Sequence, residues 1–242
     1  MRPSTRYEIK YRITPQRADA VRAWIARNME PDAFGEGGSA QYHVHSLYLD
    51  DTDWRIYKET RNGNQQRLKL RARIYDFAGV SPAFLEVKAR NGEAMTKSRA
   101  VVSRGDACAI LAGRVPDSPP SSPLDAFRNQ VDRYRAYPRA WVTYRRSAWV
   151  GGDRGLVRIT FDDQIQGAPP TADLAAPARW YDLPEVRGLV VLELKYTGSY
   201  PAWVAETVRT FDLERKSMSK YRHAVELVRS LPASTARPGT PA

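Results

Sequence analysis

The sequence predicts an α+β protein whose strands follow one another largely in hairpin order, with helices inserted between them. Three observations support this class. About eight segments alternate polar and apolar residues, Asn-Gly or Gly-Gly pairs follow several of them, and no regular strand–helix–strand alternation occurs. A doubly wound parallel sheet is therefore disfavoured. Eight antiparallel strands can close into a barrel, which is the architecture that we expect.

Strand-like alternation begins near the N-terminus and returns throughout the chain. The segments that show it are 6–13, 41–49, 67–75, 83–90, 96–103, 140–150, 156–165 and 188–196. The Asn-Gly pairs at 62–63 and 91–92 are typical of hairpin turns, and Gly151 and Gly152 predict the turn between the sixth and seventh strands.

Helical spacing of apolar residues separates these strands. Thr14 and Pro15 suit the N-cap and first position of a helix that runs to about residue 30 and includes Met29 on its apolar face. Residues 50–61 form a short connection or helical turn. The other segments with helical spacing are 105–112, 124–134, 201–211 and 219–230, while 31–40, 116–123 and most of 166–187 are expected to be loops.

We expect one domain over residues 1–231, followed by a small, polar, Pro-rich and disordered tail at 232–242. No apolar run approaches the roughly 18 residues of a membrane span, and the N-terminus shows no apolar secretion segment. The sequence therefore predicts a cytoplasmic protein.

The charge balance predicts an anionic partner. There are 38 Lys and Arg residues against 27 Asp and Glu, a net charge of +11, which favours a phosphate chain, nucleic acid or anionic lipid. One cysteine and three histidines argue against a disulfide or a zinc site, so a metal would be a hard ion held by carboxylates.

Alternation concentrates the positive charge on one face of a strand. In 67–74, Arg67, Lys69, Arg71 and Arg73 share a face opposite the apolar residues. A solvated sheet face would also alternate, but it would mix both charges with neutral polar residues. Like charges this close repel by roughly 1 kcal/mol or more per pair at reduced dielectric, so an anion is expected to neutralise them.

Acidic residues accompany these cations in a repeated pattern. The tripeptide Glu-apolar-Lys occurs three times on expected strands, at 8–10, 86–88 and 193–195. Carboxylates would repel a simple anionic ligand, but they are useful if they hold a divalent metal that bridges phosphate oxygens. Cations plus a metal are the components of phosphoryl transfer.

These segments together resemble a known family. The strings at 7–11, 44–53, 67–75 and 85–88, continued by 144–146, 157–162, 193–195 and 217–221, are similar to the VTC (vacuolar transporter chaperone) polyphosphate polymerase domain over about residues 5–228. That family belongs to the triphosphate tunnel metalloenzymes. The resemblance implies a closed, antiparallel, eight-stranded tunnel with helices packed outside it. It also implies transfer of the ATP γ-phosphate to a polyphosphate chain with Mn²⁺ or Mg²⁺.

The resemblance also assigns roles to individual residues. The side chains that it implies for catalysis and phosphate binding are Lys10, Arg71, Arg73, Lys88, Lys97, Arg145, Arg158 and Lys220. Three more cations, Lys69, Arg146 and Lys195, would line or support the site. Glu193 would be the principal metal ligand, and Glu8 and Glu86 are weaker candidates, either as ligands or as partners that orient the lysines.

Arg6 stands where the related CYTH phosphatases have the first acid of Glu-x-Glu-x-Lys, which favours the polymerase branch. Hydrolysis of tripolyphosphate or an organic triphosphate, and polyphosphate binding without catalysis, remain alternatives. The partners expected are ATP, triphosphate or polyphosphate. Nucleic acid is disfavoured because no stacking aromatic residues are interleaved with the basic face.

Several other polar or aromatic residues are expected to be structural. His43 and His45 suit packing or capping, and Asp162 with Asp163 suits a turn at the end of a strand. Asp50, Asp51 and Asp53 also suit a structural turn, whereas Trp24, Trp203 and Phe211 suit the core faces of helices.

Overall fold

A computed structural model describes residues 6–32, 41–92, 94–151, 157–198 and 200–232. The chain divides into two compact units. Unit 1 comprises residues 1–43, 144–165 and 184–218, and unit 2 comprises 44–143, 166–183 and 219–242. The single domain expected over 1–231 stays a prediction. The expected tail lies outside the described residues, apart from Pro232.

Unit 1 is built on antiparallel strands. β1 (Arg6–Ile13) pairs with β10 (Val190–Thr197), and β10 pairs with the first part of β8 (Val157–Ala168). These three strands were expected from the sequence. The short β2 (Met29–Pro31), which was not expected, pairs with the end of β7 (Tyr137–Gly151).

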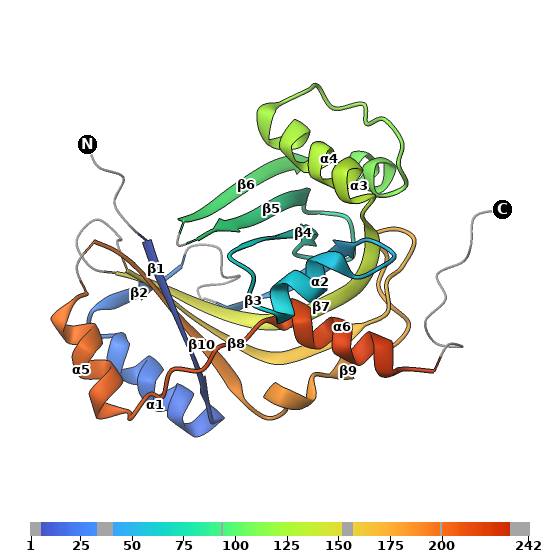
Figure 1. Cartoon of the computed structure of the whole chain (residues 1–242). Coiled ribbons are helices and arrows are strands. Elements are labelled where there is room, and N and C mark those ends of the chain that lie inside the picture. Colours follow the sequence, from blue (N-terminus) through green and yellow to red (C-terminus); the bar gives the residue numbers. More distant parts are fainter. Residues whose placement is uncertain (1–5, 33–40, 93, 152–156, 199, 233–242) are drawn as a thin grey trace. The chain divides into compact units, whose positions relative to one another are not determined.

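Two helices cover the apolar side of these strands. α1 (Pro15–Ile25) and α5 (Ala202–Thr210) lie side by side next to β1 and β10, as Figure 1 shows. Their apolar residues form one buried cluster with Ile13, Phe161 and Leu192. A 3-10 turn, η3 (Pro184–Val186), precedes β10. The apolar faces of the strands are therefore shielded by helices, as the alternation predicted.

The first helix is shorter than expected. Thr14 caps it by accepting a hydrogen bond from the Arg17 backbone, and Pro15 occupies the first turn, as predicted. The helix ends at Ile25, however, and Met29 belongs to β2, so the extension to about residue 30 is wrong. The reason is that Met29 pairs in register with Gly151, an interaction that the local apolar spacing cannot reveal.

Unit 2 contains the antiparallel series β3 (Gln41–Asp50), β4 (Gln66–Ile74), β5 (Ala83–Asn91) and β6 (Ala94–Val102), with the first three residues of β3 in unit 1. β9 (Tyr181–Asp182) pairs with the end of β8. The loop expected at 166–187 therefore contains two pieces of strand.

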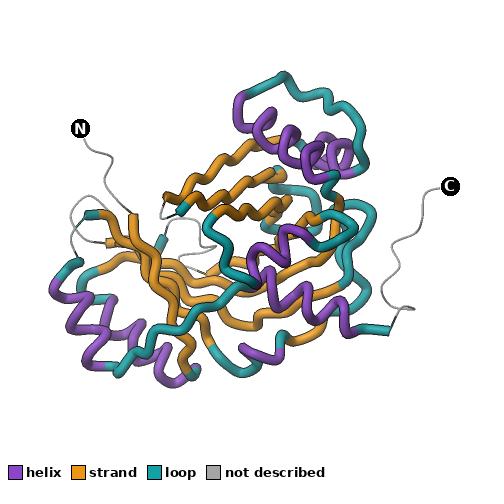
Figure 2. Tube along the Cα trace, viewed as in Figure 1, coloured by secondary structure: helices purple, strands orange, loops and turns teal. Residues whose placement is uncertain are grey.

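Among the residues described, four helices belong to unit 2. α3 (Arg104–Leu111) and α4 (Ser122–Tyr134) contact β5. α2 (Arg55–Arg61) lies beside α6 (Lys220–Ser230). Figure 2 shows α3 next to α4, and α2 next to α6, as purple coils. Asp50 is fully buried and accepts hydrogen bonds from the backbone of Ile56 and Tyr57 and from the Tyr221 hydroxyl. Its structural role is thereby confirmed, and it ties α6 to the start of α2.

The two Asn-Gly pairs have different outcomes. Asn91 pairs with Ala94 across the β5–β6 connection, and Gly92 adopts a φ of 60°, which confirms the predicted hairpin. Asn62 instead caps the end of α2, and Gly63, with a φ of 70°, leads into β4, so the hairpin interpretation of this pair is wrong. A glycine with positive φ suits the end of a helix equally well, which is why local sequence cannot separate the two.

The hydrogen-bonded order of the main strands is β1-β10-β8-β7-β3-β4-β5-β6. The structure is therefore a mixed α+β fold with a large antiparallel sheet. Within the described residues no ladder joins β1 to β6, so closure into a barrel stays a prediction. No helix in the same ranges is both long and apolar enough to cross a membrane.

We predict that Gly151→Ala destabilises the protein. A Cβ atom at this position would lie 2.6 Å from the carbonyl oxygen of Asn28 and 2.8 Å from Cγ of Met29, so β2 would have to move. We expect the free energy of unfolding to fall by about 1–3 kcal/mol in urea denaturation. Gly105→Ala is the control, because the nearest atom to its added Cβ is 3.8 Å away. Equal stability of the two variants would contradict the close approach.

Candidate functional site

The cationic face of β4 continues across the two neighbouring strands of unit 2. In register, Lys69 of β4 lies opposite Lys88 of β5, and Lys88 lies opposite Lys97 of β6. Residues paired in this way have Cβ atoms about 5 Å apart. Three lysines therefore form one row across the sheet, while Leu68 and Leu70 on the other face are buried as predicted.

The next row contains the counter-charge. Glu86 of β5 is paired with Arg71 on one side and Arg99 on the other. Its side chain is only 1% exposed; Oε2 accepts a 2.6 Å hydrogen bond from Arg71, and Oε1 lies 2.8 Å from Lys97 and 2.7 Å from Arg99. Arg73 is 3.9 Å from the same carboxylate. One negative charge among these four cations leaves a large positive excess in unit 2.

These cations also control the titration of the cluster. Burial alone would raise the pKa of Glu86, but Arg71, Arg73 and Lys97 outweigh it and lower the pKa. Conversely, burial together with nearby Arg99 and Arg71 lowers the pKa of Lys97 to about 8, in spite of the attraction to Glu86. Glu86 is therefore ionised, whereas Lys97 can lose its proton in a mildly basic solution.

Tyr48 is a member of this cluster that sequence reasoning missed. It is paired with Arg71 in the β3–β4 register, and its hydroxyl accepts a 3.0 Å hydrogen bond from Nη1 of that residue. Burial raises the pKa of Tyr48, but Arg71, Arg73 and Lys220 together lower it below its ordinary value. Alternation along β3 could have identified Tyr48, had its partner strand been known.

The start of α6 supplies the remaining predicted cation of unit 2. Lys220 is the first residue of this helix, and the preceding Ser219 caps it by accepting from the Arg222 backbone. Lys69 Nζ donates to the hydroxyl oxygen of Ser219 over 3.0 Å. Unit 2 thus gathers all of its predicted cations on β4, β5, β6 and the first turn of α6.

Unit 1 holds a separate cluster in which acids and cations balance. The β1–β10 register places two copies of the repeated tripeptide opposite each other, with Glu8 against Lys195 and Lys10 against Glu193. Lys195 Nζ lies 2.7 Å from Glu193, and Lys10 Nζ lies 3.1 Å from Glu8 and 3.6 Å from Glu193. Two antiparallel copies of Glu-apolar-Lys are therefore complementary to each other.

Glu193 is buried, and Lys10 lies between its carboxylate and that of Glu8. Burial raises the pKa of Glu193, but Lys195 and Lys10 outweigh it and hold the pKa well below its ordinary value. Burial also lowers the pKa of Lys195, although the negative charges of Glu193 and Glu8 act to raise it. Two carboxylates that lie near the same lysine are a suitable oxygen donor set for a hard divalent cation.

The two adjacent arginines of β7 form different pairs. Arg146 donates to both oxygens of buried Asp162, over 2.6 and 2.8 Å, and lies 3.9 Å from Glu193. Arg145 forms the equivalent pair with Asp163, over 2.9 Å, and Asp163 is also 3.9 Å from Arg22 of α1. Successive residues of a strand point to opposite faces. Arg146 therefore shares the face of Glu193, and Arg145 lies on the face next to α1.

Asp162 and Asp163 do not form the expected turn. Strand β8 continues past them to Ala168, so the interpretation as the end of a strand is wrong. The reason is that both carboxylates are neutralised by arginines of the neighbouring strand, which allows charged residues in the middle of β8. Arg158, earlier in β8, lies opposite Lys195 and 2.5 Å from Asp32.

Comparison with known protein families identifies the family of this chain. A sequence model of the VTC domain matches residues 5–229. The chain belongs to the VTC-domain family. The resemblance found in the sequence is thereby confirmed, and it places the chain among the triphosphate tunnel proteins. No curated protein matches this VTC-domain chain.

Three solved structures are similar to this chain at low sequence identity, and the first supports the fold. A Bacillus halodurans protein described as a candidate adenylate cyclase is 13% identical, with a TM-score of 0.50, covering 88% of this chain and 93% of its own. A Vibrio parahaemolyticus protein with the same description is 13% identical (TM-score 0.46, covering 90% and 96%). A Pyrococcus horikoshii protein is 14% identical (TM-score 0.45, covering 91% and 99%).

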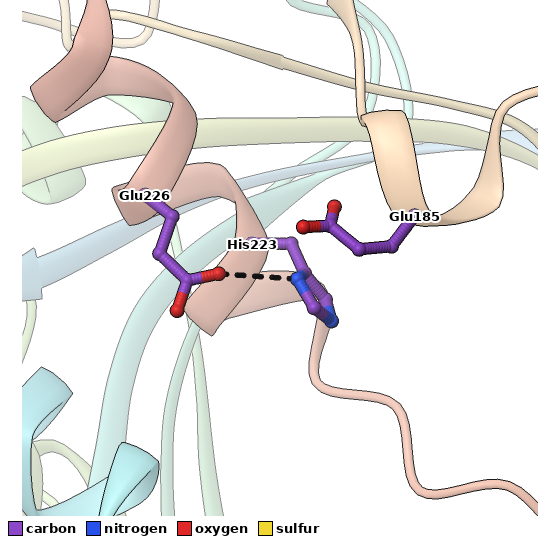
Figure 3. Close-up of side chains that lie close together, drawn as sticks. All are labelled: Glu185, His223 and Glu226. Atoms are coloured by element: carbon purple, nitrogen blue, oxygen red, sulfur yellow. Dashed lines mark ion pairs between the residues drawn. The ribbon is translucent and has the colours of Figure 1, made fainter.

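Several of the other residues singled out from the sequence of this VTC domain have structural contacts. His45 is buried, with its Nδ1 2.8 Å from the Thr143 hydroxyl and its ring against Phe77. Trp24 and Phe211 meet edge to face, and together with Trp203 they pack against the core of unit 1, as expected. His223, which the sequence did not single out, is buried and lies 3.2 Å from Glu226 on α6 (Figure 3).

We predict that Glu86→Gln destabilises the protein because it leaves four cations without their shared anion. The free energy of unfolding should fall by roughly 3–5 kcal/mol, the usual effect of breaking a buried ion pair. Thermal and urea denaturation would measure this, with the exposed Glu206→Gln as the matched control. A Glu86→Gln variant as stable as the control would show that the cluster does not need this charge.

We further predict a stability change linked to Lys97. Its pKa in the folded protein, about 8, lies below the value of 10.5 in an unfolded chain. The folded protein therefore binds fewer protons between these values, so this group makes folding more favourable as pH rises from about 8 to 10.5. Urea denaturation between pH 7 and 10 should show wild type gaining stability relative to Lys97→Gln. A constant difference across this range would contradict the shifted pKa.

Proposed function

We propose that this protein is a metal-dependent phosphotransferase of the polyphosphate polymerase type, which transfers the γ-phosphate of ATP to the end of a polyphosphate chain. The observation that carries the proposal is the extended positive face of unit 2. From Arg67 to Arg73 the cationic positions of β4 span about 20 Å at the usual rise of a strand. A triphosphate has only three phosphorus atoms and would occupy a fraction of this length.

The phosphate chain would bind to the cations of unit 2. Arg71 and Arg73 offer guanidinium groups that can donate two hydrogen bonds to phosphate oxygens, and the row Lys69, Lys88 and Lys97 offers compact charges. In this proposal Glu86 is not a metal ligand. Both of its oxygens already accept from cations, so it serves to hold the arginines in place.

The cluster of unit 1 would hold a divalent metal ion together with phosphate groups of the substrate. Glu193 and Glu8 fit a Mg²⁺ or Mn²⁺ site, because such ions use one or two carboxylates together with water and substrate phosphates. A bound ion would neutralise charge on the phosphate that is transferred. Lys10, Lys195 and Arg146 would bind the surrounding phosphate oxygens. The resemblance gave the phosphate-binding role to Arg145. We assign that role to Arg146 instead, because Arg146 shares the face of Glu193.

The proposed reaction is a direct displacement. A terminal oxygen of the polyphosphate chain attacks the γ-phosphorus, the bond between that phosphorus and the bridging oxygen breaks, and ADP leaves with the electron pair. The attacking oxygen is already anionic, so no general base is required. A closed tunnel and a cytoplasmic location belong to the same proposal.

The proposal is tested by incubating the purified protein with ATP and Mn²⁺ and separating the products by gel electrophoresis. Long phosphate chains together with ADP are the expected result. Orthophosphate as the sole phosphate product would instead indicate a hydrolase. Binding of polyphosphate without any turnover would indicate a noncatalytic module.

We predict that Glu193→Gln lowers the rate of this reaction by at least about a hundredfold, because the proposed metal loses its principal ligand. Glu214→Gln is the matched control, because this side chain is 76% exposed and pairs only with Lys216 among the residues described. Circular dichroism would establish that both variants are folded. Equal rates for the two variants would remove Glu193 from the mechanism.

A further inference from the structure

One end of the cationic face of unit 2 is apolar. The last row of this face pairs Arg73 of β4 with Phe84 of β5, and Phe84 with Val101 of β6. Residues that lie opposite each other in antiparallel strands share a face, so Phe84 and Val101 lie on the face of the cations. Val101 is 62% exposed and Phe84 is half-buried. Phosphate binding does not explain an apolar row (Phe84 and Val101) on a charged face.

The apolar row does not belong to the core of unit 2. Leu85 and Ala100, the chain neighbours of Phe84 and Val101, point to the other face and are buried. α4 contacts the two strands that carry them, and Figure 1 shows this helix beside β5 and β6. The exposed side chain of Val101 therefore points away from the helix that covers the apolar face of these strands.

Arg99 is held in a fixed position next to the apolar row. Its Nε and Nη2 atoms each lie 2.7 Å from Oε1 of Glu86, and its guanidinium carbon lies over the Phe84 ring, 4.9 Å from the ring centre. The Phe84 ring in turn meets Tyr75 edge to face at 5.4 Å. The side chain of Arg99 is still 35% exposed. One side of the guanidinium group therefore rests on an aromatic ring, while part of the side chain faces solvent.

A guanidinium group fixed in this way is suited to stacking on a nucleobase. Guanidinium planes stack on aromatic groups, bases among them, and the charge remains available to phosphate oxygens. Among the residues described on this face, one such stack is found, and it lies at the end of the face. A nucleic acid strand needs a succession of stacked bases, whereas a mononucleotide needs one. A lipid would need more apolar surface than one exposed valine and one half-buried ring.

The spacing of the rows suits a nucleoside triphosphate. The row of Arg71 lies about 7 Å from the apolar row and the row of Lys97 about 14 Å from it, because side chains on one face of a strand recur every two residues. The ribose separates a base from its phosphates, so a base at the apolar end would place its phosphates along these two rows. The row of Arg67, at the far end of the face, is left for the phosphate chain.

We propose that the base of the nucleoside triphosphate donor stacks on the guanidinium group of Arg99, which Phe84 supports from behind, and that Val101 borders the base. The phosphates of the same molecule bind along the rows of Arg71 and Lys97. This inference rests on the proposed function, since it concerns the donor of that reaction. The site distinguishes a nucleoside triphosphate from an inorganic triphosphate without selecting one base, because every base has a π face.

The test compares a ligand that has a base with one that lacks it. Isothermal titration calorimetry with Mn²⁺ would measure binding of a nonhydrolysable ATP analogue and of inorganic tripolyphosphate to wild type and Arg99→Lys. Lysine keeps the charge but lacks the plane, so the ATP analogue should bind roughly tenfold more weakly, while the affinity for tripolyphosphate should stay within about twofold. Arg114→Lys, at an exposed position between α3 and α4, is the matched control and should bind both ligands like wild type.

Phe84→Leu provides a second variant that changes no charge. It removes the ring behind Arg99, so it should also weaken binding of the ATP analogue and leave that of tripolyphosphate unchanged. Unchanged binding of tripolyphosphate shows in both cases that the variant is folded.

The inference and the proposed function fail in different ways. If wild type binds both ligands and Arg99→Lys affects neither, or weakens both equally, the base does not stack on Arg99 and the inference alone is overturned. The same holds if Phe84→Leu binds the ATP analogue as wild type does. If wild type does not bind the ATP analogue at all, the proposed function fails together with the inference.

Discussion

The pairing of charges across antiparallel strands is the interaction on which both clusters depend. In unit 1 the acids Glu8, Glu193 and Asp162 face Lys10, Lys195 and Arg146, so the local charge is close to neutral. In unit 2 the single carboxylate of Glu86 has four cationic neighbours. The first arrangement suits a metal and a small charged ligand. The second maintains a positive face that an external polyanion can neutralise.

The family assignment and the geometry together refine the roles of individual residues. Membership of the VTC-domain family is shown by a match over nearly the whole chain. Family resemblance alone could not separate Arg145 from Arg146, because both follow the same tyrosine in the sequence. The pairs with Asp163 and Asp162 separate them, since they place the two guanidinium groups on different faces of β7.

Alternation along single strands was predictable, because a strand has a period of two residues whatever its neighbours are. The cationic face of β4 and the capped start of α1 were therefore found from sequence. Features that depend on which strands are paired could not be predicted from the sequence. The carboxylate that neutralises β4 comes from β5, Tyr48 comes from β3, and the strand pairing of Met29 involves β7. Each of these requires knowledge of which strands are neighbours.

The opposed tripeptides of β1 and β10 have a consequence for assembly of the sheet. If β1 shifted by two residues along β10, the same side chains would stay on each face. A shift in one direction would pair Glu8 with Glu193, and a shift in the other would pair Lys10 with Lys195. Either misalignment brings like charges together, and a slip of one residue would turn the apolar side chains toward the polar face. The four charged residues of these two tripeptides thus also select a single alignment while the chain folds.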